Sequence, residues 1–204
     1  MSKSDRLVYE YGYGARIGAV LAATAMWALA LSALGGGVYL LVLGQPVAAG
    51  LACLIGLIIA PYCVSLQHSM RMKHEWRVSL RPGHVTLCLP ANRASHHHTE
   101  SFEGEVGYRD IHQIVRRREV YSRMGIQTTT MPYWLVLKDG RKLLLGEDRN
   151  PGDGEAGRTT IVARSAEAIS RTSGIQLVRA EPGQGRSLLF GLLANRPPAW
   201  PQDV

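Results

Sequence analysis

The pattern of apolar and polar positions divides the chain into two parts. Between Ile17 and Leu66 the sequence contains no Lys, Arg, Asp or Glu. One helix crosses the ~30 Å hydrocarbon core of a bilayer with about 20 apolar residues, so this run predicts two transmembrane helices joined by a tight turn. A buried hairpin in a soluble protein would need a second large apolar layer to cover it, and the rest of the sequence offers none.

Two short segments are candidates for the turn, Gly35–Gly37 and Gly44-Gln45-Pro46. Gln and Pro make a polar break that starts a new helix, which favours the second segment and predicts spans of about 16–43 and 46–66. The three glycines would then lie inside the first span, where small residues permit close helix packing. A cleaved signal peptide is the alternative, with Ala28-Leu29-Ala30 as the cleavage site, but the apolar run continues beyond that point.

After this run the pattern changes to the alternation of period two that is typical of strands. Residues 67–75 are polar and basic, which predicts that the second helix ends outside the bilayer. The segments "WRVSL" and "HVTLCL", on either side of "RPG", predict a β-hairpin. The apolar residues expected to face one another across it are Val78, Leu80, Val85, Leu87 and Leu89.

Further along the chain, residues 90–104 have no periodicity and are expected to form an exposed loop, and β character resumes near Glu105. The clearest hairpin is "PYWLVLKDGRKLLLG", because Asp139-Gly140 is a strong two-residue turn signal between apolar strands. The segment "RTTIVARSAEAISRTSG" has helical period, and Gly174 suits its C-cap.

These elements predict an α+β membrane protein, in which a two-helix transmembrane hairpin precedes an antiparallel β barrel or sheet with a C-terminal helix. A parallel doubly wound sheet is not expected, because no βαβ alternation appears. The predicted organisation is a cytoplasmic N-terminus (1–15), the transmembrane hairpin (16–66), a cytoplasmic β domain (75–180) and a Pro/Gly-rich tail (181–204).

The order of the elements resembles the bacterial pleckstrin-homology-like domain of small membrane proteins. The resemblance lies in the helical hairpin ahead of the domain and in "YRDIHQIV", "WLVLKDGRKLLLG" and "SGIQLV", and it covers roughly residues 75–180. It implies a seven-stranded, partly open barrel capped by a helix, without a catalytic residue or a fixed ligand. The His-rich loop (residues 90–104) and the tail after Val178 depart from the family pattern. The resemblance therefore indicates the fold of the domain but not its function.

The distribution of charged residues predicts how the helices are oriented in the membrane. The formal net charge is +7, and basic residues flank the apolar run on both sides. Because Lys and Arg concentrate on the cytoplasmic side of a membrane, we expect a multi-pass protein of the bacterial inner (plasma) membrane with both termini in the cytoplasm. The expected membrane-interface anchors are Arg16, Arg71, Lys73, Trp76 and Arg77.

His96-His97-His98 with Glu100 is the first candidate for metal binding. Zinc needs several ligands that converge in tetrahedral geometry. Of three consecutive side chains, only His96 and His98 could share a face, and His84 and His112 would help only if the fold brings them close. We therefore expect a solvated polar loop without a metal, and metal-dependent hydrolysis around these histidines is the alternative.

Arg116-Arg117-Arg118 is the more informative cluster. In a strand, Arg116 and Arg118 share one face and Arg117 takes the other. Beside a bilayer such a face would attract anionic headgroups with about 1 kcal/mol per basic residue. It would equally suit the acids of a partner protein, and a solvated edge strand is the third interpretation. The candidate contact residues are Arg109, Arg116, Arg118 and Arg123.

The sequence contains no motif that indicates catalysis or a cofactor. "GDGEAGRTT" lacks the Gly-Lys-Ser/Thr ending of a P-loop, and Cys53, Cys63 and Cys88 lack the spacing of a metal or redox site. The spans contain no ionisable carboxylate or basic residue, which argues against an ion path. No recognition helix or stacking platform indicates nucleic acid.

We therefore expect a noncatalytic accessory or scaffold protein that binds an integral membrane protein complex, or further copies of itself, through its helices and β domain. Small residues on the helices offer faces for close packing; they are Gly18, Ala22, Ala23, Gly50 and Gly56. The alternative function is the sensing of anionic membrane lipids through Arg116–Arg118.

Overall fold

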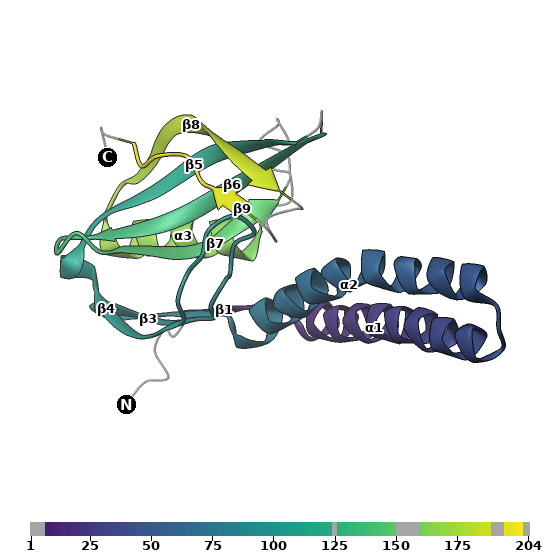
Figure 1. Ribbon diagram of the computed structural model, residues 1–204. Helices are drawn as coiled ribbons and strands as arrows, with labels where there is room; N and C mark the ends of the chain where they lie inside the picture. Colours follow the sequence, from purple (N-terminus) through teal and green to yellow (C-terminus); the bar gives the residue numbers. More distant parts are fainter. Residues whose placement is uncertain (1–6, 124–125, 150–159, 189–193, 202–204) are drawn as a thin grey trace. The chain divides into compact units, whose positions relative to one another are not determined.

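The structure is a computed structural model of the 204-residue chain. It describes residues 7–123, 126–149, 160–188 and 194–201. The chain divides into two compact units (Figure 1). Tyr11–His74 form a helical unit, and the segments on either side of it in the sequence together form a β unit.

The helical unit consists of α1 (Tyr13–Val42) and α2 (Pro46–Glu75), each 30 residues long. Both helices are long and apolar enough to cross a membrane. The turn between them contains Gly44 with a φ of +73°, so the prediction of a turn at residues 44–46 is confirmed. Gly35–Gly37 lie inside α1.

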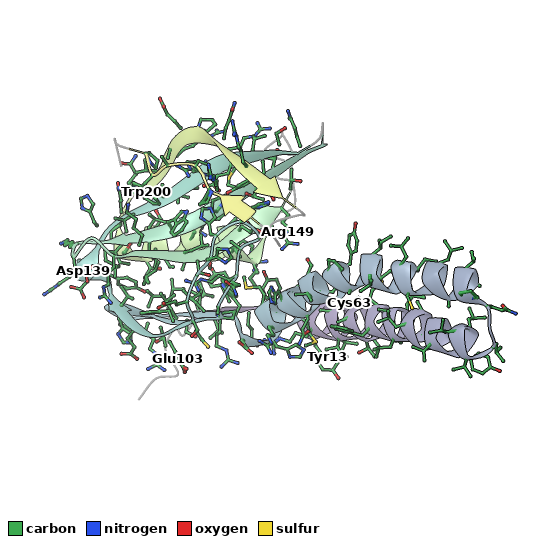
Figure 2. The ribbon with its side chains drawn as sticks, in the orientation of Figure 1. Tyr13, Cys63, Glu103, Asp139, Arg149 and Trp200 are labelled. Carbon is green, nitrogen blue, oxygen red and sulfur yellow. The ribbon has the colours of Figure 1, made fainter. Side chains whose placement is uncertain are left out.

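The two helices contact each other through small residues. A Cβ atom on Gly37 would lie 2.5 Å from the Sγ atom of Cys53, and one on Gly56 would lie 2.7 Å from Cγ of Leu34. Cys63, labelled in Figure 2, is fully buried. Many large apolar side chains instead lie on the outside of the unit, so the helices are apolar on their exposed faces as well; examples are Leu21, Leu31, Leu41, Leu51, Leu57 and Ile58.

The β unit contains an antiparallel sheet of four strands in the order β1 (Leu7–Glu10), β2 (Arg77–Arg81), β3 (His84–Leu89) and β4 (Phe102–Gly107). The predicted β2–β3 hairpin is confirmed, with Val78 opposite Leu87 and Leu80 opposite Val85. Strand β1 lies in the segment predicted as the cytoplasmic N-terminus (1–15), and it is too short to show an alternating pattern. Because Glu10 pairs with Arg77, the helical unit is an insertion between two paired strands.

The second sheet has five strands in the order β7 (Lys142–Arg149), β6 (Ile126–Leu137), β5 (Ile111–Arg123), β8 (Leu177–Leu188) and β9 (Ala194–Arg196). The short 3-10 helix η1 (Tyr108–Asp110) leads into β5. The predicted 132–146 hairpin is present as β6–β7. Its loop has three residues rather than two, because Leu137 N–H bonds to the carbonyl of Arg141.

Strands β5 and β8 are parallel, so the prediction of a purely antiparallel arrangement was wrong. Helix α3 (Ile161–Ser173) carries the chain back across the sheet, and β8 then enters in the direction of β5. The predicted tail therefore begins inside a strand. Pro182 is tolerated there because it lies at a bulge, where the β5–β8 register shifts between Arg117 and Glu119.

Helix α3 lies between the two sheets and contacts strands of both. The predicted C-cap is confirmed, since Gly174 has a φ of +72°. At the N-terminal end the hydroxyl of Thr160 accepts a bond of 3.2 Å from the N–H of Ala163. The fully buried apolar residues of the β unit include Ile169 of α3 together with Trp76, Val78, Leu87, Ile114, Leu135 and Leu145. The described residues thus form an α+β unit of nine strands and one long helix.

Candidate functional site

The His-rich loop is packed against the β unit, which corrects the expectation of an exposed loop. Arg93 and His96 are only 6% and 5% exposed. The Arg93 guanidinium donates from Nε to the carbonyl of Leu144 in β7, and from Nη1 to the carbonyls of Pro90 (2.9 Å) and Glu100 (2.6 Å). Such side-chain anchoring to single carbonyls has no periodic signature, so the sequence pattern did not reveal it.

A fully buried carboxylate, Glu119 on β5, lies beneath this loop. One of its oxygens accepts bonds from Arg117, at 2.7 Å from Nη2 and 3.1 Å from Nε. The other oxygen lies 2.7 Å from Nε2 of His97 and accepts a 2.6 Å bond from the Tyr121 hydroxyl. Burial by itself raises the pKa of Glu119, but the bonds from His97, Tyr121 and Arg117 outweigh it and lower the pKa overall. The group is therefore ionised at neutral pH.

Three segments far apart in the sequence meet around Glu119. The ring of His96 stacks on Tyr121 with centroids 3.7 Å apart. Arg117 also donates to the carbonyls of Ala199 (2.6 Å) and Pro198 (3.2 Å). The loop, the central strand β5 and the C-terminal segment are thereby held together by one network. Burial lowers the pKa of His96, so its imidazole is neutral at pH 7.

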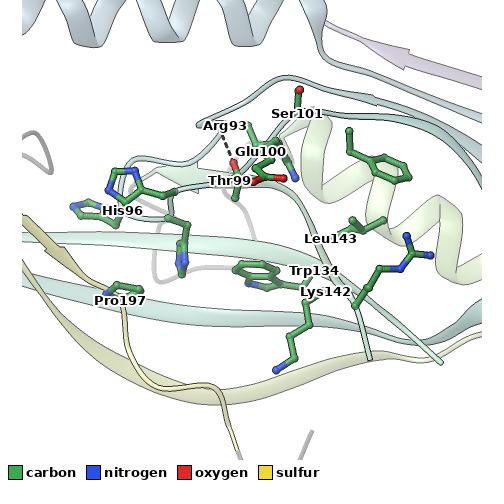
Figure 3. A pocket seen from close by; sticks show the side chains of 13 residues that line it. Arg93, His96, Thr99, Glu100, Ser101, Trp134, Lys142, Leu143 and Pro197 are labelled. Atoms are coloured by element: carbon green, nitrogen blue, oxygen red, sulfur yellow. Dashed lines mark hydrogen bonds between the residues drawn. The ribbon is translucent and has the colours of Figure 1, made fainter. Parts of the chain in front are cut away.

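A cavity of about 600 Å³ opens beside this network, within the range of 300–1,000 Å³ that is usual for small-molecule sites. Figure 3 shows Trp134 and Lys142 on one side of it and Thr99, Glu100 and Ser101 on the other. The ring of Trp134 makes edge contacts with His97 (5.1 Å) and Trp200 (5.5 Å). The lining residues are Arg93, His96, His97, His98, Thr99, Glu100, Ser101, Phe102, Trp134, Arg141, Lys142, Leu143 and Pro197.

The basic cluster on β5 does not form an edge stripe. Strand β5 is paired on both sides, with β6 and β8, so the interpretation as a solvated edge strand was wrong. Arg117 is buried against Glu119, and Arg116 and Arg118 are half-buried. Arg109 is exposed in η1, and the side chain of Arg123 lies outside the described residues.

Of the predicted membrane-interface anchors, Trp76 needs correction. Its side chain is fully buried in the β unit, and its indole N–H donates to the carbonyl of Leu145 at 2.7 Å. It is therefore a core residue. Arg16 donates to the carbonyl of Lys73 (3.2 Å), Arg77 pairs with Glu10 (3.1 Å), and Arg71 is exposed.

The predicted histidines are divided among different partners. His97 contacts Glu119, His96 stacks on Tyr121 and His98 is exposed. His84 lies 3.4 Å from Glu105, and His112 is exposed. Within the described part of the chain, no group of three or more His, Cys, Asp or Glu residues could hold a metal ion.

Sequence reasoning missed Arg93, Glu119, Trp134 and Lys142 as site residues. One signal was available, because Arg117, Glu119 and Tyr121 alternate along one face of a strand, with opposite charges next to each other on that face. The comparisons with known proteins add no relative: no protein-family model, no curated protein and no solved structure matches the chain.

Proposed function

We propose that this protein is a noncatalytic accessory or scaffold subunit of the bacterial inner membrane. Its two helices cross the bilayer and pack against transmembrane helices of a protein complex, and its β unit lies in the cytoplasm. The observation that carries the proposal is an open row of small residues on α1, formed by Gly14, Gly18 and Ala22.

These three residues follow one another at intervals of four, so they share one face of the helix. All three are exposed, and a Cβ atom on Gly14 or Gly18 would meet nothing within 4 Å. The contact between α1 and α2 uses other small residues, such as Gly37 and Gly56. In a bilayer, small residues let two helix backbones approach closely, and here such a face remains for a further helix.

The strand pairing supports two crossings of the membrane. Because β1 and β2 are neighbours in one sheet, the chain leaves the β unit at Glu10 and returns to it at Arg77. A hairpin of two spans returns the chain to the side from which it left, as this pairing requires. The half-buried positions of Arg116 and Arg118 make lipid sensing the weaker alternative. The proposed likeness to bacterial pleckstrin-homology-like domains implies a seven-stranded barrel capped by a terminal helix, and the β unit differs from it, because β8 and β9 follow α3 and β8 is parallel to β5.

The test is an affinity purification from native membranes in mild detergent after brief cross-linking, with a tag after Val204. We expect one stoichiometric companion that persists through size exclusion. The double variant Gly18→Leu/Ala22→Leu should lose it, because two bulky side chains would fill the open face.

Thr24→Leu/Ala28→Leu is the matched control, since these residues are also exposed and four apart but lie on another face of α1. This control should keep the companion. A wild-type protein that runs alone would contradict the proposal, and so would equal loss in both double variants. Flotation of the full chain with anionic liposomes would then test the lipid alternative.

A further inference from the structure

A buried positive charge without a partner carboxylate lies in the wall of the cavity. Arg93 is 6% exposed, and the acceptors of its hydrogen bonds are neutral carbonyls. Among the described residues it forms no ion pair. Burial lowers its pKa to about 10, so the side chain remains charged at pH 7. A buried charge that no opposite charge balances is unfavourable, and an anion in the cavity would relieve it.

The guanidinium of Arg93 also has donors to spare. Its bonds within the described chain use Nε and Nη1, which leaves the two N–H groups of Nη2 for a further acceptor. A carboxylate or phosphate oxygen is the acceptor that suits a guanidinium best.

Lys142 supplies a second cation to the same cavity. Its Nζ lies 4.0 Å from the ring centre of Trp200, and it has no carboxylate partner among the described residues. Arg141, by contrast, pairs with Asp139 at 2.6 Å. Glu100 is the acidic member of the described lining. Its side chain is exposed, and the group that it gives to Arg93 is its carbonyl.

The remaining walls favour a ligand that also has an apolar part. Trp134, Phe102 and Leu143 line the cavity. The Nδ1 atom of His96 is buried without a hydrogen-bond partner among the described residues, so it is available for one hydrogen bond with a ligand.

Glu119 does not line the cavity, and its carboxylate is already bonded to Arg117, His97 and Tyr121. It therefore leaves the charges of Arg93 and Lys142 unbalanced.

We propose that this cavity binds a small organic anion, a carboxylate or phosphate attached to a planar apolar group. Arg93 and Lys142 hold the anionic oxygens, and Trp134 and Phe102 pack against the apolar group. This site lies within the β unit, and the inference does not depend on the proposed packing of α1 in the membrane.

The test uses the full chain in nanodiscs of phosphatidylcholine and isothermal titration with naphthalene-2-carboxylate. Its neutral amide, naphthalene-2-carboxamide, has nearly the same shape. We expect saturable one-site binding of the carboxylate, with the amide at least about tenfold weaker. Lys142→Gln should weaken carboxylate binding about tenfold, because it removes a cation from the exposed side of the site without disturbing the core.

Lys138→Gln is the control, since Lys138 is an exposed lysine of the same hairpin outside the cavity lining, and it should bind like the wild type. The proposal is overturned by equal affinity for carboxylate and amide, by undiminished binding in Lys142→Gln, or by no saturable binding. Repeating the titration in nanodiscs with phosphatidylglycerol separates two sources of the anion. Competition would identify a lipid headgroup as the natural ligand, and unchanged affinity would identify a soluble one.

Discussion

Glu119 is the residue at which the β unit keeps a negative charge in its interior. A buried carboxylate is tolerated only when hydrogen bonds and an opposite charge replace its water. Arg117 supplies the charge, and His97 and Tyr121 bond to the second oxygen. Since these partners come from β5 and from the His-rich loop, the network fixes the position of that loop as well as the charge.

Replacing Glu119 with Gln should lower the free energy of unfolding by about 3 kcal/mol at pH 7, because the Arg117 charge would stay buried without its partner. The pKa of Glu119 is lowered in the folded protein. The wild type therefore has the full contribution above the ordinary Glu pKa of about 4.3 and loses it as the pH falls through the folded pKa. Thermal unfolding, followed by tryptophan fluorescence between pH 7 and pH 3, measures both effects.

The control for this experiment is Glu105→Gln, whose side chain is 57% exposed and whose loss should change stability little. In Glu119→Gln the acid-dependent fall in melting temperature should be smaller than in the wild type. A Glu119→Gln protein as stable as the wild type at pH 7 would show that the network contributes nothing to folding.

Substitution of Trp76 tests whether its side chain lies in the core of the β unit or at a membrane surface. Trp76→Phe removes the buried bond to the Leu145 carbonyl and leaves that acceptor unsatisfied, which should cost about 2 kcal/mol of unfolding free energy. Thermal melts of the β unit in the full chain measure this change. Trp27→Phe in α1 is the matched control and should leave those melts unchanged. An unchanged melting temperature in Trp76→Phe would refute the core position.

At the scale of elements, the helix pair depends on glycine where the two backbones come closest. A Cβ atom on Gly37 would lie 3.1 Å from the carbonyl oxygen of Ala49 and 3.2 Å from the backbone nitrogen of Cys53. Backbone atoms cannot move aside as a side chain can, so the helices would have to separate.

Gly37→Ala should therefore destabilise the helical unit by about 1–3 kcal/mol, the usual cost of overpacking. Gly35→Ala adds the same methyl group to the same helix, where a Cβ atom meets nothing within 4 Å. It should be neutral or slightly stabilising. Loss of helicity on titration with sodium dodecyl sulfate, followed by circular dichroism, compares the two variants. Equal midpoints would contradict the close contact at Gly37.

The elements that could be predicted from the sequence are those that depend on patterns of neighbouring residues. The β2–β3 and β6–β7 hairpins have alternating apolar residues and a turn signal, and α3 has both of its caps. Strand β8 could not be predicted in the same way. It contains Pro182, Gly183 and Gly185, which favour a loop by local propensity, and it becomes a strand because β5 offers a partner along its length.

For the whole molecule, the proposed crossing of the membrane by both helices, together with the pairing of β1 with β2, requires both ends of the helix pair to lie on one side of the membrane, which we propose is the cytoplasmic side. In a background without native cysteines, Gln45→Cys should react with a membrane-impermeant maleimide in intact cells. Asp139→Cys, in the exposed turn of the β unit, should react only after lysis. Labelling of both positions from outside would refute the orientation, and labelling of neither would refute the exposure of the turn.

The sequence by itself determined the two long helices, the turn between them and the order of the main hairpins and α3. These features depend on runs and periods of neighbouring residues, which the chain carries whatever its tertiary contacts. Only the tertiary structure decided that β1 and β8 join sheets and that Trp76 is a core residue. It also decided that Arg93 is buried against neutral carbonyls and that Glu119 is buried against Arg117. Each of these depends on partners far away in the sequence, such as Leu145 for Trp76 and His97 for Glu119. Burial and charge balance arise only when such distant segments meet.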